Sequence, residues 1–263
     1  MNIEFYKYHG AGNDFVIIDN RKNIFNADDK ETAFLCDRHY GIGADGLMLL
    51  ENHESLDFTM RYFNSDGHEA TMCGNGGRCI VAFANHLGII KNQTRFMASD
   101  GLHIAEISIN NDQYKVRLQM QDVSLNEYSN KPYFLDTGSP HHINIINNTD
   151  DAEVEKIGAK IRYSDEYQSI GGTNVNFVQI VDHNKIKIRT YERGVECETL
   201  ACGTGSVAAA IHYGISKKLL KSTVQVEALG GNLEVSYEIL SNFARNVFLT
   251  GPAKMVFKGQ LKL

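Results

Sequence analysis

Short apolar runs bounded by glycine, asparagine and aspartate recur along the first half of the chain, a pattern typical of β-strands separated by turns. A helix is expected to begin at residues 27–29, with helical spacing continuing over residues 31–39. Residues 79–84 are apolar on nearly all sides, so they predict a buried helix with Gly88 as its C-terminal cap. The expected strands are residues 3–8, 15–19, 47–51 and 58–63, then strands and turns over 94–120 with breaks at 100–101 and 110–112.

The second half repeats this order of elements. Residues 151–163 predict a helix with apolar side chains at spacings of three and four. Residues 207–211 predict another helix that is apolar on all sides, with Gly214 beyond it. Because element order and helix character recur, the pattern indicates a duplication. The expected strands are residues 134–136, 143–146, 174–180, 185–191, 224–228, 233–240 and 246–250, with a turn at 137–142.

The two halves are expected to form separate domains. Residues 122–131 read as a linker, and the closing strand at residues 254–257 is expected to return to the first half. The predicted domains are therefore residues 1–121, joined by 252–263, and residues 122–251. Both have the size of an ordinary domain with its own core.

A Glu-x-x-x-Cys-Gly-x-Gly motif occurs in each half, directly before the all-apolar helix. It places Cys73 and Cys202 at equivalent positions, one at the start of each helix. The glycine after each cysteine lets backbone N–H groups approach a ligand closely. The first N–H groups of a helix lack partners within the helix and lie at its positive end, so two such ends could bind a carboxylate. The same field lowers a cysteine pKa from about 8.5 toward neutrality.

Two thiols suit the removal of a proton from one face of a carbon and the return of a proton to the opposite face. This is the chemistry of racemisation or epimerisation at an amino-acid α-carbon, so the two thiols are expected to face each other across a substrate. Acid–base catalysis is most efficient when the pKa values lie near the working pH, which thiols can satisfy in both directions. The other three cysteines, Cys36, Cys79 and Cys197, are expected to be buried as small apolar residues.

Composition and charge narrow the class of protein. The chain is 43% hydrophobic and 22% charged, with a net charge of −6 and no long run of one sign, which argues against nucleic-acid or membrane-surface partners. We find no N-terminal apolar h-region and no apolar run long enough to cross a bilayer in the sequence, so a cytoplasmic location is expected. An odd number of cysteines indicates free thiols in a reducing compartment. No cysteine pair has the C-x-x-C spacing of a zinc site, so no metal is expected.

The motifs resemble those of diaminopimelate epimerases over essentially the whole chain. The resemblance implies a mixed α/β (α+β) fold of two pseudo-symmetric domains, each a barrel-like sheet around a buried central helix. It also implies a homodimeric isomerase without a cofactor, which interconverts LL- and meso-2,6-diaminopimelate in lysine and peptidoglycan precursor synthesis. The matching segments include His-Gly-Ala-Gly-Asn-Asp-Phe at 9–15, Gly-Ile-Gly-Ala-Asp-Gly at 41–46, Met-Cys-Gly-Asn-Gly-x-Arg-Cys at 72–79, Asn-Val-x-Phe-Val-Gln at 174–179 and Tyr-Glu-Arg-Gly-Val at 191–195.

The resemblance also implies roles for individual residues. Cys73 and Cys202 would be the acid/base pair, the first accepting and the second donating the proton in one direction. His141 and Glu192 would modulate the thiol pKa values. The implied substrate contacts are backbone N–H groups of Gly74, Asn75, Gly203 and Thr204 for the carboxylate at the reacting carbon, Asn13 and Glu192 for its ammonium group, and Asn64, Asn174 and Arg193 for the distant amino-acid end, with Arg193 bidentate to its carboxylate.

Two positions depart from the family pattern. Gly46 stands where the family often has glutamine, and Ser139 stands where it often has asparagine. Gly46 can offer only backbone contacts, and the side chain of Ser139 has a shorter reach. Both are therefore left outside the expected site.

Other interpretations of the same residues predict different chemistry. Residues 41–46 match the dinucleotide motif G-x-G-x-x-G, but they follow a helical stretch and precede a strand-like run, the reverse of what that motif needs. A cysteine hydrolase would leave the second cysteine motif unexplained. A binding module of the same fold would bind an amino acid without exchanging its α-hydrogen. A proline racemase would share the cysteine pair, but Asn64, Asn174 and Arg193 favour a substrate with a second polar end.

Overall fold

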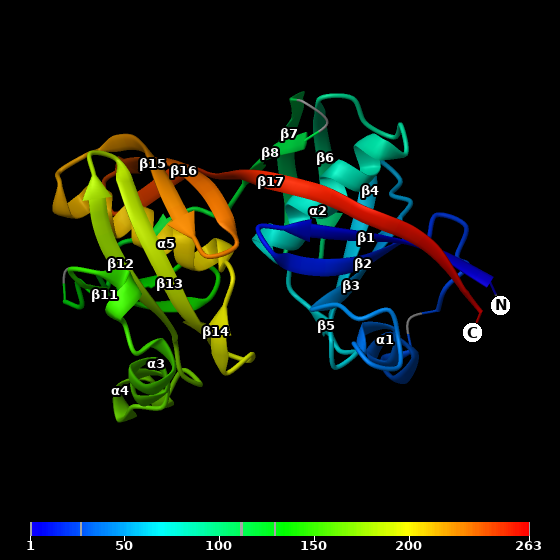
Figure 1. Ribbon diagram of the computed structural model, residues 1–263. Helices are drawn as coiled ribbons and strands as arrows, with labels where there is room; N and C mark the ends of the chain where they lie inside the picture. Colours follow the sequence, from blue (N-terminus) through cyan, green and yellow to red (C-terminus); the bar gives the residue numbers. More distant parts are fainter. Residues whose placement is uncertain (1, 27, 111–112, 129, 263) are drawn as a thin grey trace. The chain divides into compact units, whose positions relative to one another are not determined.

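The chain folds into two compact units (Figure 1). The first comprises Met1–Leu118 with Gly251–Leu263, and the second comprises Gln119–Thr250. The computed structural model describes residues 2–26, 28–110, 113–128 and 130–262. Residue 27 of the expected helix start and residues 111–112 of an expected turn lie outside these ranges.

Eight strands of the first unit close into a barrel. In pairing order they are β17 (Phe243–Lys262), β1 (Asn2–Gly10), β2 (Asn13–Asp19), β3 (Gly46–Glu51), β4 (Phe58–Asn64), β6 (Gln93–Ala98), β7 (Gly101–Asn110) and β8 (Gln113–Gln119), and β8 pairs again with β17. The pairs β2–β3 and β4–β6 are parallel. Parallel neighbours need a long crossover, and α1 (Asp29–Cys36) and α2 (Gly74–His86) lie in these two crossovers. The short strand β5 (Glu69–Ala70) adds to β4 just before α2.

The second unit repeats this arrangement. In pairing order its strands are β10 (Phe134–Asp136), β11 (Pro140–Ile145), β12 (Asn174–Asp182), β13 (Lys185–Glu192), β15 (Lys221–Ala228), β16 (Gly231–Leu240), the first part of β17, and β9 (Val123–Ser124). Two pairs are again parallel, β11–β12 and β13–β15, with one antiparallel pair, β12–β13, between them, just as β3–β4 lies between the parallel pairs of the first unit. Their crossovers contain η1 (Thr149–Asp151), α3 (Val154–Arg162), α4 (Asp165–Gln168), β14 (Cys197–Thr199) and α5 (Gly203–Ser216). The shared order of parallel and antiparallel neighbours confirms the predicted pseudo-symmetric fold.

A buried helix belongs to each barrel, as the sequence predicted. Every residue of α2 from Gly74 to Ala84 is buried, and most of α5 is buried as well. In the first unit, α1 packs against the opposite face of the sheet through Leu35, which shares a core cluster with Val16 and Leu47. Strands covered on both faces carry continuous apolar runs, which is why β2 and β3 were visible in the sequence.

Strand β17 is long enough to contribute to both barrels. Its first part pairs with β16, and its last part pairs with β1, from Asn2 opposite Lys262 to His9 opposite Lys254. The closing residues therefore pair with the first strand of the chain. Part of the predicted linker at residues 122–131 is also ordered into the sheet, because β9 pairs with Phe243 and Ala244.

Several predicted helix boundaries were wrong by a few residues. Helix α1 ends at Cys36 rather than His39, and α3 begins only after the separate 3₁₀ turn η1. Gly214 lies within α5 rather than beyond it. A Cβ atom at Gly214 would lie 1.6 Å from the Tyr237 hydroxyl oxygen, so this glycine allows α5 to pack against β16.

The prediction for Cys197 was wrong. Cys36 and Cys79 are buried as expected, whereas Cys197 is exposed. It lies in β14, a three-residue strand that pairs only with the end of β13 among the described pairings. A strand this short offers little sheet to cover it, and apolar character alone does not show how short a strand will be.

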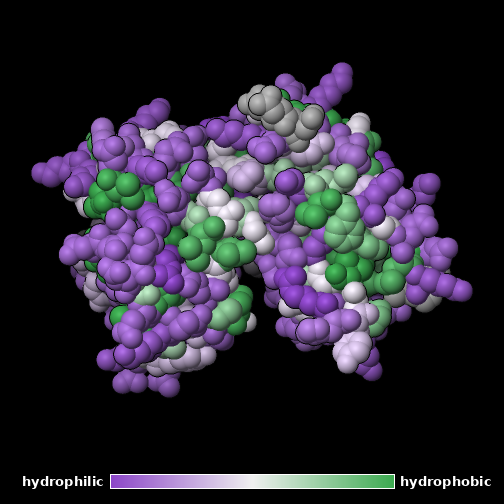
Figure 2. Space-filling view, in the orientation of Figure 1, coloured by the Kyte–Doolittle hydropathy of each residue, from purple (hydrophilic) through white to green (hydrophobic). Residues whose placement is uncertain are grey.

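The surface of each unit is mainly hydrophilic on the face shown in Figure 2, and apolar residues form separate patches on it. Isolated apolar side chains on a surface are normal for folded proteins. Within the described ranges, no helix is both long and apolar enough to cross a membrane.

Candidate active site

Cys73 immediately precedes α2, as its N-cap residue, with an extended backbone at φ −94° and ψ 131°. Its side chain is partly exposed, whereas Gly74 and Asn75, the first two residues of the helix, are buried. The thiol therefore lies beside the N-terminal N–H groups of a buried helix, where a negative charge is favoured.

Asn13, the first residue of β2, lies next to Cys73. The Asn13 Oδ1 atom lies 3.7 Å from Cys73 Sγ and accepts a hydrogen bond of 3.2 Å from Asn75 Nδ2. The first unit thus brings three of the predicted site residues into one hydrogen-bonded group. Asn64 is exposed at the end of β4, opposite Gly46 in the β3–β4 register.

Cys202 occupies the equivalent N-cap position of α5 and is 8% exposed. The Gly205 backbone N–H donates to Cys202 Sγ at 3.4 Å, and Thr204 Oγ1 lies 3.4 Å from the same sulfur. Hydrogen bonds to a charged form favour that form. The Gly205 N–H therefore favours a thiolate at Cys202, and the Thr204 hydroxyl adds to this when it donates to the sulfur.

His141 supports Thr204 from within β11. Asn176 Nδ2 lies 3.0 Å from the His142 carbonyl oxygen, which can only accept, and 3.1 Å from His141 Nδ1. Nδ1 therefore accepts, and a neutral ring carries its proton on Nε2. Nε2 lies 3.0 Å from Thr204 Oγ1 and 3.0 Å from Ser139 Oγ. The second unit thus contains a chain of contacts from Asn176 through His141 and Thr204 to the Cys202 sulfur.

His141 stays neutral at physiological pH. Its side chain is fully buried, and burial, followed by the positive charge of Arg193, lowers the pKa of His141 to about 3. The sequence placed this residue in a turn, but β11 begins at Pro140 and so fixes His141 in the sheet. A neutral, immobile ring acts as a hydrogen-bond donor rather than as a proton carrier.

Arg193 and Asn174 form a second group in the same unit. The Arg193 backbone N–H donates to Asn174 Oδ1 at 2.9 Å. The Arg193 guanidinium makes two long contacts, 3.3 Å and 3.4 Å, with the carbonyl oxygens of Ile170 and Gly172. In the part of the chain that the structure describes, no acidic side chain pairs with this guanidinium. Glu192, next to it, accepts a hydrogen bond of 2.8 Å from Thr199 Oγ1.

Comparison with known protein families shows which family contains this chain. The sequence model of the family described as diaminopimelate epimerase matches residues 5–126 and 133–256. The chain belongs to the diaminopimelate epimerase family. Diaminopimelate epimerases of Flavobacterium psychrophilum and Chlorobaculum tepidum are 50% and 44% identical to it over 259 and 262 residues, which cover 97% of the chain and 99% of each relative.

A solved structure shows the same fold at low sequence identity. The Bacillus anthracis phenazine biosynthesis protein of the PhzF family is 15% identical to this member of the diaminopimelate epimerase family. The two structures share a TM-score of 0.77 over 100% of both chains. The likeness shows that the architecture persists when most residues differ.

Some residues of these groups were missed in the sequence. Asn176 lies two residues after Asn174 on β12, so both side chains share one face of the strand, and this spacing was a usable signal. Ser139 was left outside the expected site, yet its Oγ contacts both His141 and Asn174. Arg78 is a charged residue within an apolar helix; it is fully buried and donates to Asn75 Oδ1 at 2.8 Å.

Nothing in the described residues resembles a metal centre. They contain no group of three or more histidine, cysteine, aspartate or glutamate side chains placed to hold an ion.

Replacement of Thr204 by valine is expected to lower turnover by about 10- to 100-fold, because a hydrogen bond to a charged group contributes roughly 1.5–3 kcal/mol. The variant keeps the shape of the side chain but removes the hydroxyl between His141 and Cys202. Alkylation of Cys202 by iodoacetamide, followed peptide by peptide in mass spectrometry, should also require a higher pH. Thr204→Ser retains the hydroxyl and is the matched control. Equal turnover and alkylation profiles for the two variants would contradict the proposed contact.

Proposed function

We propose that the chain interconverts LL- and meso-2,6-diaminopimelate, with Cys73 and Cys202 as its two acid/base groups. Membership of the diaminopimelate epimerase family supports the reaction. The observation that carries the assignment of residues is the equivalence of the two cysteines. Each is the N-cap of a buried helix in one of two barrels with the same strand order.

In the proposed reaction, the thiolate of one cysteine takes the α-proton and becomes a thiol. The electron pair left on the α-carbon is delocalised into the carboxylate. The thiol of the other cysteine then gives its proton to the opposite face of the carbon and becomes a thiolate. One proton leaves the substrate and one returns, so the pair ends with its roles exchanged and no cofactor is consumed. The reverse direction uses the same two groups.

The negative charge on the carboxylate increases as the proton leaves. Backbone N–H groups of Gly74 and Asn75 at the start of α2, and of Gly203 and Thr204 at the start of α5, are proposed to bind this carboxylate. Donors that are already oriented toward developing charge stabilise a transition state more than a ground state. The helix ends thus serve both substrate binding and catalysis.

The ammonium group at the reacting carbon needs acceptors. Asn13 Oδ1 and the Glu192 carboxylate are proposed to supply them. Asn13 Oδ1 lies 3.7 Å from Cys73 Sγ, so an ammonium bound there would bring the α-carbon close to the sulfur. Short range between base and proton is a condition of general base catalysis.

The distant amino-acid end of the substrate is proposed to contact Asn64, Asn174 and Arg193. The Arg193 guanidinium pairs with no acidic side chain among the described residues and makes only long contacts with carbonyl oxygens. Its remaining N–H groups can meet both oxygens of a carboxylate. Asn174 orients this region, because it accepts from the Arg193 backbone and donates to the Pro140 carbonyl oxygen at 2.9 Å.

Replacement of Arg193 by alanine is expected to lower kcat/KM for diaminopimelate by about 10²-fold or more. Truncating one partner of a hydrogen-bonded charge pair typically costs about 2–5 kcal/mol. Most of the change should appear in KM, because the distant carboxylate is bound equally in the ground state and the transition state. Steady-state kinetics measure this. Arg193→Lys keeps the charge without the bidentate geometry, so its kcat/KM should lie between those of the unmodified chain and Arg193→Ala. An unchanged KM for diaminopimelate in Arg193→Ala would count against the contact.

Proton NMR of LL-diaminopimelate in deuterium oxide tests the function directly. Loss of the α-proton signal together with the appearance of meso-diaminopimelate is the expected result, without added pyridoxal phosphate. Proline serves as the control substrate and should keep its α-proton. Binding without any exchange would indicate a binding module, and exchange of proline would indicate a racemase of cyclic amino acids.

The assembly and location of the protein are part of the same proposal. A homodimer in the cytoplasm is proposed on the resemblance to the family. The structure supports a reducing compartment, since all five cysteines are free thiols and structural disulfides belong to oxidising environments.

A further inference from the structure

The segment of residues 41–46, which resembles a dinucleotide-binding motif, has a different role in this fold. It follows α1 and leads into β3. It places Asp45 in contact with Asn13, the first residue of β2. We infer that Asp45 is a positioning residue that fixes which end of the Asn13 side-chain amide faces the substrate, with Arg38 holding Asp45 in place. The inference rests on the proposed role of Asn13 as an acceptor for the substrate ammonium.

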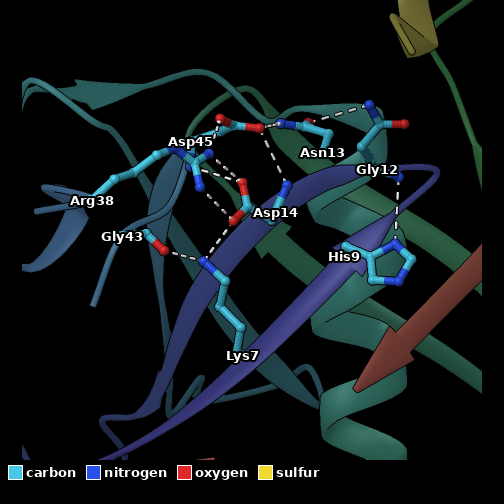
Figure 3. A network of polar contacts seen from close by, with 9 residues as sticks. Lys7, His9, Gly12, Asn13, Asp14, Arg38, Gly43 and Asp45 are labelled. Carbon is cyan, nitrogen blue, oxygen red and sulfur yellow. Dashed lines mark hydrogen bonds and ion pairs between the residues drawn. The ribbon is translucent and has the colours of Figure 1, made fainter. Parts of the chain in front are cut away.

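Asp45 uses both of its carboxylate oxygens (Figure 3). One oxygen, Oδ2, accepts a hydrogen bond of 2.6 Å from Asn13 Nδ2 and one of 3.2 Å from the Asp14 backbone N–H. The other, Oδ1, accepts a hydrogen bond of 2.7 Å from Arg38 Nη2. An ionised carboxylate is an acceptor only, so the Asn13 amide must turn its nitrogen toward Asp45.

This orientation leaves the Asn13 oxygen at the other end of the amide. That oxygen accepts from Asn75 Nδ2 at 3.2 Å and lies 3.7 Å from Cys73 Sγ. The two ends of an asparagine amide have nearly the same shape but opposite hydrogen-bonding character. An ammonium group can only donate, so a flipped amide would present a donor to a donor. The contacts with Asp45 and Asn75 both favour this orientation, and the one with Asp45 is the shorter and the only one of the two that involves a charged group.

Arg38 is itself anchored by a second carboxylate. Its Nη1 and Nη2 atoms donate to the two Asp14 oxygens at 3.1 Å and 2.7 Å, and Lys7 Nζ lies 2.6 Å from Asp14 Oδ2 (Figure 3). Burial disfavours the charged form of Asp14, but hydrogen bonds from Arg38 and Lys7 outweigh it and lower its pKa to about 2. Lys7 also donates to the Gly43 carbonyl oxygen. Two cations and two anions thus hold the segment before β3 against the turn between β1 and β2.

An amide at position 45 could not replace the carboxylate. The single oxygen of the new amide would accept from Arg38. The amide nitrogen would then face Asn13 Nδ2 and the Asp14 N–H. Donor would then face donor unless the Asn13 amide flipped. The opposite rotamer would place the new nitrogen against the guanidinium of Arg38. Only a group with acceptors on both sides satisfies Arg38 and Asn13 together.

Exchange of the two side chains tests the inference. Asp45→Asn is expected to lower kcat/KM for diaminopimelate by about 10-fold or more, mainly through KM, because one hydrogen bond to a charged group is lost. Asn13→Asp is expected to lower it as well, since two carboxylates would then meet at a short distance. In the double variant Asn13→Asp/Asp45→Asn, the amide at position 45 can donate to the carboxylate at position 13 while its oxygen faces Arg38. A carboxylate oxygen of residue 13 then faces the substrate, so activity should recover above that of either single variant. It should stay below that of the unmodified chain, because the new amide nitrogen still faces the Asp14 N–H.

Asp19→Asn is the matched control. Asp19 lies at the other end of β2 and pairs with Arg21 at 2.7 Å, so its loss removes an Asp–Arg pair of the same unit away from Asn13. It is expected to keep the kcat/KM of the unmodified chain. Thermal unfolding of all four variants separates loss of fold from loss of orientation, because a folded double variant that recovers activity cannot be explained by stability alone.

Three outcomes would overturn the inference. Asp45→Asn with unchanged kcat/KM would show that the contact does not matter. A folded double variant no better than the better of the two single variants would show that amide orientation is not what Asp45 controls. Full activity of Asn13→Ala would remove Asn13 from the site and the inference with it. An inactive Asn13→Ala beside a fully active Asp45→Asn would instead leave the proposed function intact and reject only the role of Asp45.

Discussion

Replacement of either Cys73 or Cys202 by alanine is expected to stop epimerisation of diaminopimelate, with turnover lowered by about 10³-fold or more. In the proposed mechanism each thiol handles the proton on one face of the α-carbon, so neither can substitute for the other. Both side chains are small, and Cys73 is only partly buried, so the fold should survive. Proton NMR in deuterium oxide measures the conversion, and thermal unfolding checks the fold. Cys197→Ala, at an exposed position, is the control and should keep full activity.

The single variants should also retain a diagnostic partial reaction. The remaining thiolate can still remove an α-proton from the face that it meets and return a deuteron to that same face. One variant should therefore exchange hydrogen at the L α-carbon and the other at the D α-carbon, in both cases without inversion. Exchange at the same centre by both variants would contradict a two-base mechanism. Near-normal turnover by either would reject the cysteine as a catalytic group.

The duplicated architecture could be predicted from sequence because its signals are local. The all-apolar runs that became β2 and β3, and the helices α2 and α5, are continuous in the chain and need no knowledge of distant contacts. The repeated cysteine motif showed which residues of the two halves are equivalent, with Cys73 matching Cys202. The strand orders of the two barrels then followed the same alternation of parallel and antiparallel pairs.

The support around the site could not be predicted in the same way. His141 was placed in the predicted turn at residues 137–142, but β11 begins at Pro140 and pairs in parallel with β12. Its partner Asn176 is 35 positions away in the chain. The contact between Asn13 and Asp45 spans 32 positions. Pairings of this kind depend on strand register, which the local pattern of apolar residues does not specify between distant segments.

The two halves share a topology but surround their sulfurs differently. Cys73 lies beside the Asn13 amide oxygen, an acceptor. Cys202 is approached by the Gly205 backbone N–H and by the Thr204 hydroxyl. Hydrogen-bond donors favour a thiolate and an acceptor favours a thiol. Both cysteines are helix N-caps, so the described side-chain and backbone contacts add donors at Cys202 and an acceptor at Cys73 to a helix-end field that favours a thiolate at each.

The second glycine of each Cys-Gly-x-Gly motif shows the same asymmetry, and Gly205→Ala is expected to be far more damaging than Gly76→Ala. A Cβ atom at Gly205 would lie 2.4 Å from Asn176 Oδ1 and 3.3 Å from Cys202 Sγ. Asn176 is fully buried and held by Thr190 Oγ1, which donates to the same oxygen at 3.1 Å, so it cannot move aside. At Gly76 the nearest atom is the Met48 sulfur at 3.2 Å, and a methionine side chain adapts readily.

Gly205→Ala should therefore lower the free energy of unfolding by about 1–3 kcal/mol, the usual cost of overpacking, with the melting temperature falling by roughly 2–4 °C for each kcal/mol. Turnover should fall as well, because a displaced Asn176 no longer supports His141 behind Thr204 and Cys202. Calorimetry and the deuterium-exchange assay measure the two effects, with Gly76→Ala as the control that should change both only slightly. Similar melting temperatures and turnover for the two variants would mean that Asn176 yields to the added methyl group. The contacts from Asn176 to Cys202 would then be too loose to tune the sulfur.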